Sequence, residues 1–149
     1  MFRYKGVLLT LGVILLLGIA AYIALTIQIR QETRAELAVD LKIPSLPASV
    51  QEVSCRREPV MTDVLFHCYF EIDPSDFPAL LAGHKYKVSD LKTTSHDVFE
   101  RITEYGDLGK KFDIAKRYFV EPREYKDGGS ITIYTDAAQR HIIYDLYIE

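Results

Sequence analysis

The sequence predicts an α+β fold in which one transmembrane helix precedes a small domain built on a mostly antiparallel sheet. An uncharged apolar run over residues 7–27 predicts the helix, and alternating apolar and polar residues further along predict the strands. The expected domain holds a β-hairpin, two short helices and a three-stranded β-meander. The chain divides into a short cytoplasmic leader (1–6), the transmembrane helix (7–27), a stalk and linker (28–47) and an exported α+β domain (48–149).

The apolar run VLLTLGVILLLGIAAYIALTI is long enough to cross a bilayer. About 20 residues at about 1.5 Å each span the hydrocarbon core, and a helix satisfies their backbone groups internally. A cleaved signal peptide is the alternative, because Arg3 and Lys5 form a basic start. The length of the run and its poor cleavage site favour an uncleaved anchor that contacts the lipid bilayer. Ala20 and Ala24, four positions apart, are a weak signal for a homodimer through this helix.

The segment after the anchor has the composition of a helical stalk. Residues 28–42 are rich in Ala, Leu, Glu and Arg, which are good helix formers. Like charges one turn apart, such as Arg30 and Arg34, weaken this helix slightly. Pro44 and Pro47 then end it, because proline disfavours the helical conformation in the residue before it. We therefore expect the folded domain to begin at residue 48.

The chain has two cysteines, Cys55 and Cys68, and the alternation around them predicts a β-hairpin. From 64 to 72 every second residue is apolar or cysteine, which is typical of a strand with one buried face. Folding 51–57 antiparallel onto it brings Cys55 opposite Cys68, Val53 opposite Phe70, and Gln51 opposite Ile72, with the turn near Pro59–Thr62. Directly opposed residues at a non-hydrogen-bonded position lie about 4.5 Å apart, which suits a disulfide.

A disulfide between Cys55 and Cys68 would place the domain in an oxidising compartment. Two free cysteines in a cytosolic core are the alternative, since free cysteine packs as a small hydrophobic side chain. The count of basic residues favours the opposite orientation, because Arg30, Arg34 and Lys42 follow the helix. We give more weight to the cysteine pair, which predicts a single-pass protein of a bacterial inner membrane with its C-terminal domain in the periplasm.

The remaining elements follow from turn signals and periodicity. DPSDFPALLAG (73–83) and residues 97–105 are predicted as short helices, separated by a polar loop. Residues 117–121, 130–135 and 140–149 are predicted as strands joined by turns at 126–129 and 136–139. In the last strand, Ile142, Tyr144 and Leu146 share one face.

Charge and motifs exclude several classes of function. Of the 18 Lys and Arg residues, two precede the apolar run, so 16 face 21 Asp and Glu, a net charge of −5. We expect no nucleic-acid partner and no attraction to anionic lipid headgroups. The four histidines lack the spacing of a metal site, and no nucleophile elbow or phosphate-binding glycine loop occurs. We predict no catalytic residue, metal or cofactor.

The sequence favours a binding protein with an unknown protein partner. The outer face of the hairpin predicts a partner-binding surface of apolar, aromatic and charged side chains: Arg56, Leu65, His67, Tyr69 and Glu71. One form is an immunity-type inhibitor of a toxin. One alternative is a scaffold or accessory subunit of a cell-envelope complex, and another is a small hydrolase-like enzyme that uses the His84–Asp97 loop.

Overall fold

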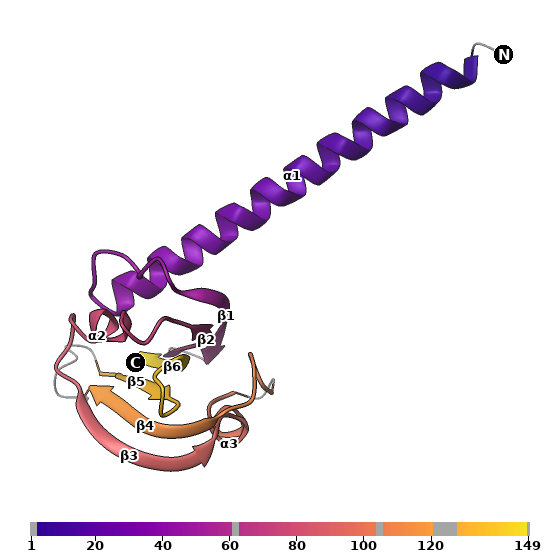
Figure 1. The fold of residues 1–149 in the computed structure, drawn as a ribbon. Helices are drawn as coiled ribbons and strands as arrows, with labels where there is room; N and C mark the ends of the chain where they lie inside the picture. The colour runs from indigo at the N-terminus through magenta and orange to yellow at the C-terminus, as the bar shows by residue number, and fades with distance from the viewer. Residues whose placement is uncertain (1–2, 61–62, 104–105, 121–127, 149) are drawn as a thin grey trace.

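The computed structural model describes residues 3–60, 63–103, 106–120 and 128–148. It confirms an α+β fold in which a long N-terminal helix leads into a domain with one six-stranded antiparallel sheet (Figure 1). The elements in chain order are α1 (Arg3–Asp40), β1 (Gln51–Val60), β2 (Asp63–Glu71), α2 (Phe77–Leu80), β3 (Lys87–Thr94), α3 (Ser95–Ile102), β4 (Asp113–Val120), β5 (Ser130–Thr135) and β6 (His141–Ile148).

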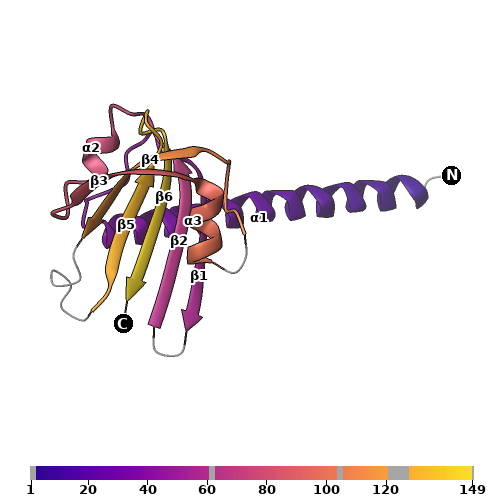
Figure 2. The same cartoon turned by 90° about the horizontal axis from the view of Figure 1, so that it is seen from below.

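The sheet has the strand order β1-β2-β6-β5-β4-β3, so β1 and β3 are its two edges. In Figure 2 the strands from β1 to β5 lie side by side, with α3 in front of the sheet and α1 behind it. Figure 1 shows β3 and β4 curving around the far side of the domain. Helix α1 leaves the domain beside β1, which makes β1 the edge nearest to the apolar end of the helix (Figure 2).

Helix α1 is apolar and exposed on all sides over much of its length. Among the residues whose side chains are described, large hydrophobic side chains from Val13 to Ile29 are about half exposed or more. A helix with apolar residues all round needs an apolar environment, and α1 is long and apolar enough to cross a membrane. The protein therefore carries one candidate membrane span within its described residues.

The last turns of α1 belong to the folded domain. Leu37 and Leu41 are fully buried in the larger of two cores, and Ile43 and Leu46 follow them into it. This differs from the expected stalk and linker over 28–47, because α1 runs unbroken to Asp40 and its apolar residues pack on the sheet. The spacing of Leu37 and Leu41, one turn apart, is the signal in the sequence for this contact.

The larger core fills the face of the sheet beneath α1. The predicted face of β2 is confirmed, with Phe66, Cys68 and Phe70 buried there, and the same holds for Ile142, Tyr144 and Leu146 on β6. The smaller core lies on the opposite face, where Val98 and Phe99 of α3 contact it. Helix α3 begins with a reciprocal capping box between Thr94 and Asp97, which satisfies backbone donors at its first turn.

The hairpin register is confirmed at the cysteines and differs beyond them. Cys55 and Cys68 are directly paired and form a disulfide, with their Cα atoms 4.1 Å apart. The predicted pair of Gln51 with Ile72 is wrong, because a bulge between Gln51 and Ser54 shifts Gln51 opposite Glu71. Val53 lies within this bulge, where the regular pairing is interrupted. Glu52 takes a positive φ of 51° at this bulge. The predicted turn falls partly on residues 61–62, outside the described part of the chain.

Three predictions about the middle of the chain require correction. The segment read as a polar loop contains β3, whose side chains are mostly exposed. An edge strand with both faces near water shows little hydrophobic alternation, so its sequence resembles a loop. The first predicted helix shrinks to the four residues of α2, and the second ends at Ile102.

Removing the disulfide should destabilise the domain by about 3 kcal/mol, because the bond restricts a loop of this size in the unfolded chain. The test is urea denaturation of the full-length protein carrying Cys55→Ala and Cys68→Ala together. Reduction of the unmodified protein should lower the denaturation midpoint similarly. An unchanged midpoint in both cases would contradict the role of the disulfide.

Asp40→Asn should stabilise the protein at neutral pH. Burial raises the pKa of the Asp40 carboxyl, so the folded state holds this proton more tightly than the unfolded state does. The ionised carboxylate also lies at the negative end of α1, where such a charge costs about 0.3–1 kcal/mol. The gain should be present at pH 7 and vanish as the pH falls below the ordinary pKa of Asp, about 4. Urea denaturation across this pH range measures the difference, and a gain that grows in acid would refute it.

Candidate functional site

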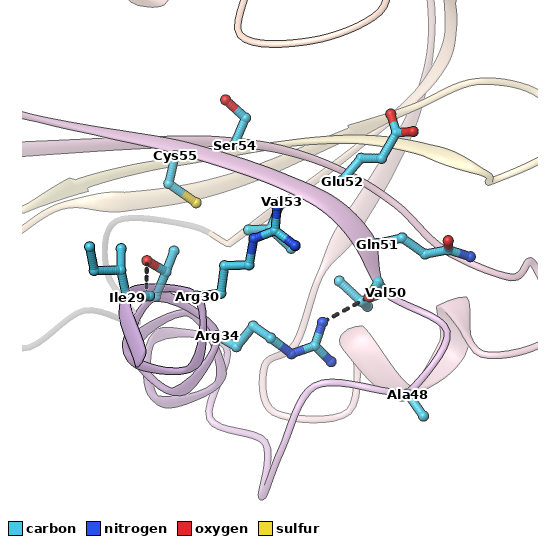
Figure 3. A pocket seen from close by; sticks show the side chains of 11 residues that line it. Ile29, Arg30, Arg34, Ala48, Val50, Gln51, Glu52, Val53, Ser54 and Cys55 are labelled. Carbon is cyan, nitrogen blue, oxygen red and sulfur yellow. Dashed lines mark hydrogen bonds between the residues drawn. The ribbon is translucent and has the colours of Figure 1, made fainter. Parts of the chain in front are cut away.

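A cleft opens where α1 separates from the edge of the sheet (Figure 3). Its volume is about 790 Å³. One wall is the α1 turn around Ile29, Arg30, Thr33 and Arg34, and the other runs from Ala48 to Cys55 along the start of β1. We call this space the juxtamembrane cleft, because Ile29 follows the apolar run by two residues.

Arg34 fixes the width of the juxtamembrane cleft. Its Nη1 donates to the Val50 carbonyl at 2.8 Å and its Nη2 to the Pro47 carbonyl at 3.1 Å. These bonds tie the loop before β1 to the helix, and Figure 3 shows the guanidinium turned toward Val50. Further along β1, Arg57 forms an ion pair with Glu36 of α1. Helix α1 is thereby connected to this edge of the sheet at two points, through Arg34 to the loop before β1 and through Glu36 to β1 itself.

Arg30 is the second arginine of the cleft and has a different environment. Its guanidinium is exposed and, within the described chain, makes no hydrogen bond or ion pair. Figure 3 shows it extending from α1 into the space beneath β1 near Val53. The cleft thus presents one cation that is used by the fold and one that is available to a ligand.

The outer edge of β1 offers backbone groups for pairing. Cys55 and Cys68 occupy a narrow, non-hydrogen-bonded pair, so the N–H and C=O of Cys55 point away from β2. Arg57 and Pro59, at every second position after Cys55, have the same backbone orientation. Proline is tolerated at this position because the N–H that it lacks would have pointed away from β2. Among the described strands β1 pairs with β2 alone. Cys55 and Arg57 therefore present a short open edge.

The predicted partner-binding surface is not a surface at two of its five positions. His67 and Tyr69 are each 1 % exposed, because α3 and the segment around Phe112 cover this face of the sheet. Arg56, Leu65 and Glu71 are half-buried. Helix α3 and the segment around Phe112, which cover this face, come from residues far along the chain. The alternation within β2 therefore could not reveal that the face is covered.

Tyr69 instead anchors a polar network at the rim of the smaller core. Its hydroxyl donates to Glu71 Oε1 at 3.0 Å and lies 3.1 Å from His141 Nδ1. Lys110 Nζ donates to the same Glu71 oxygen at 2.6 Å, and this bond is the main reason why the pKa of Glu71 is lowered. Burial raises the pKa of the Tyr69 hydroxyl. The network ties the segment before β4 to β2 and β6, which is a structural role.

The two residues predicted for acid–base chemistry, His84 and Asp97, have different partners in the structure. His84 Nε2 lies 2.9 Å from the Asp40 carbonyl at the end of α1, on the face of the larger core. Asp97 caps α3 on the opposite face, and β3 separates the two residues. His96 contacts Glu100 and Asp107 instead. The structure does not bring the His84–Asp97 pair together.

Buried His67 lies between two ionisable residues on the neighbouring strands, Arg56 of β1 and Asp145 of β6. Its Nδ1 lies 2.9 Å from Asp145 Oδ1 on the paired strand β6, although the angle does not meet that of a hydrogen bond. No group of three or more His, Cys, Asp or Glu side chains in the described residues is arranged to hold a metal ion. The expectation that no metal binds remains a prediction.

Comparison with known proteins adds no family. No protein-family model, curated protein or solved structure matches this chain. The juxtamembrane cleft and the open edge of β1 are therefore the features on which a function can be argued.

Arg34→Ala should destabilise the protein by about 1–3 kcal/mol, because it leaves the Val50 carbonyl without its side-chain donor and removes one of the two donors to the Pro47 carbonyl, which keeps the Val50 N–H. Arg30→Ala is the matched control on the same helix, with an expected change within about 0.5 kcal/mol. Thermal or urea denaturation of full-length protein in detergent measures both. Equal effects of the two substitutions would show that the Arg34 bonds do not hold the cleft.

Proposed function

We propose that this chain is a single-pass protein of a bacterial inner membrane whose periplasmic domain binds another protein at the membrane surface. The apolar part of α1 supports the anchor, and the Cys55–Cys68 disulfide supports a domain outside the reducing cytosol. The unbroken helix supports retention of the anchor, since the same element carries Leu37 and Ala38 into the core.

The open edge of β1 is the observation that carries this proposal. Outward N–H and C=O groups at Cys55 and Arg57 recur every second residue, about 6.6 Å apart. An extended polypeptide matches this spacing and can add as a further strand, whereas a small molecule satisfies at most one pair. The bulge at Glu52 and Pro59 limit pairing to the short stretch between them.

The height of this edge above the bilayer indicates where the partner lies. Arg57 contacts Glu36, which follows Ile27 by nine residues or about 13 Å of helix. The headgroup layer is about 5–8 Å deep on each side. The edge of β1 lies just outside that layer, within reach of an extended segment held at the membrane surface.

Two kinds of partner fit this position. A toxin that has inserted into the membrane would make the protein an immunity-type inhibitor, and a resident complex would make it a scaffold or accessory subunit. The hydrolase-like alternative loses its geometric basis, because His84 and Asp97 lie on opposite faces.

Photo-crosslinking in native membranes tests this proposal. A photo-crosslinking residue replacing Arg56 on β1 should give a protein adduct, and the same residue replacing the exposed Val88 on the other edge, β3, should not. An adduct in resting membranes identifies a resident complex, and one that appears with an added toxin identifies an inhibitor.

Arg57→Pro should then reduce the adduct by about fivefold or more, because it removes an outward N–H and an unmade bond in a dry contact costs about 1–3 kcal/mol. Arg57→Ala is the matched control: it loses the same ion pair with Glu36 and keeps the N–H, so its adduct should persist. A retained disulfide shows that the hairpin is intact. Equal adducts from both variants, or an adduct at β3 alone, would refute strand addition.

A further inference from the structure

We propose that the juxtamembrane cleft holds the phosphate of a phospholipid headgroup and that Arg30 is its cation. This inference rests on the proposed membrane anchor and adds a lipid partner to the protein partner at the edge of β1. The two sites are distinct, since the cleft lies between α1 and the inner face of β1 whereas the open edge points away from β2.

The position of the cleft along α1 places it among lipid headgroups. Ile29, Arg30 and Arg34 follow Ile27 by two, three and seven residues, which is about 3, 4.5 and 10 Å of helix rise. The headgroup layer covers about the first 5–8 Å beyond the hydrocarbon. The mouth of the cleft at Ile29 and Arg30 therefore lies at the depth of the phosphates.

The side chains of the cleft match a phosphate with apolar atoms on one side. Arginine binds phosphate oxygens through paired N–H donors, and Arg30 is exposed with no partner in the described chain. Ile29 and Val53 border the same space and suit the glycerol and first acyl carbons. A volume of about 790 Å³ is ample for one headgroup.

Arg34 has a structural role beside Arg30. Its bonds to the Val50 and Pro47 carbonyls use two of its five N–H donors and keep the wall of the cleft in place. The ligand can therefore use Arg30 without unfolding the loop before β1. This preformed cleft would bind a headgroup without loss of structural bonds.

The net charge of the protein argues against a preference for anionic lipids. A charge of −5 beyond the anchor gives no long-range attraction to an anionic surface. A contact through the phosphate itself needs no excess negative charge, since every phospholipid carries that group. Binding should therefore occur with phosphatidylethanolamine as well as with phosphatidylglycerol.

Native mass spectrometry tests the site on full-length protein extracted from phosphatidylethanolamine vesicles into maltoside micelles. The unmodified protein should retain one phospholipid, and Arg30→Gln should lower the retained fraction at least fivefold. Arg30→Lys should lower it less, because the charge remains. Arg101→Gln on α3 is the control for loss of an exposed arginine and should change nothing.

Hydrogen exchange supplies an independent readout. Backbone amides of residues 51–55 should exchange more slowly in phosphatidylethanolamine nanodiscs than in maltoside micelles, and Arg30→Gln should abolish the difference. Excess inorganic phosphate in maltoside should not reproduce the protection, since it lacks the apolar part. Equal lipid retention by Arg30→Gln, or full protection by free phosphate, would overturn the headgroup site.

Failure of this site is distinguishable from failure of the proposed function. If Arg30→Gln retains lipid as the unmodified protein does while the Arg56 crosslink persists, the headgroup site alone is wrong. If the protein can be washed from native membranes with carbonate, the anchor is wrong and both proposals fail.

Discussion

The structure depends on the use of one helix in two environments. The apolar part of α1 is exposed on all sides, as a bilayer would require, whereas Leu37 in its last turns and Leu41 directly after it are buried in the core of the domain. Burial of each leucine contributes about 1.5–3 kcal/mol, so the domain cannot move away from the anchor without a large loss of stability. Arg34 and the Arg57–Glu36 pair add contacts on the same side. The end of α1 and the domain thus share one core, and β1 is the sheet edge nearest to the apolar part of the helix.

Coverage of both sheet faces leaves the edges as the accessible features. Helix α1 covers the larger core, and α3 with the segment around Phe112 covers the smaller one. The polar network of Tyr69, Glu71 and Lys110 closes the rim of that second layer. Of the two edges, β3 carries two lysines, Lys87 and Lys92, which discourage pairing, whereas β1 keeps outward backbone groups beside the apolar helix. This difference between the two edges supports the proposal that a partner binds along β1, beside the apolar helix.

Much of the hairpin could be predicted because its information is local. The alternation in β2 identified the residues that face the larger core, and the two cysteines fixed the register where they meet. The shift at Glu52 could not be predicted, because a bulge adds one residue without changing the residue types around it. Strand β3 was missed for a related reason: an edge strand near water lacks the hydrophobic pattern by which strands are recognised.

The sequence by itself determined the apolar helix, the pairing of the two cysteines, and the residues of β2 and β6 that face the larger core. Each of these follows from composition or periodicity within a short segment. Only the tertiary structure decided that His67 and Tyr69 are buried, that His84 contacts the end of α1 while Asp97 caps α3, and that Arg30 makes no bond beside an engaged Arg34. These outcomes depend on contacts between residues far apart in the chain. No local pattern specifies which layer covers a face or where a helix parts from a sheet.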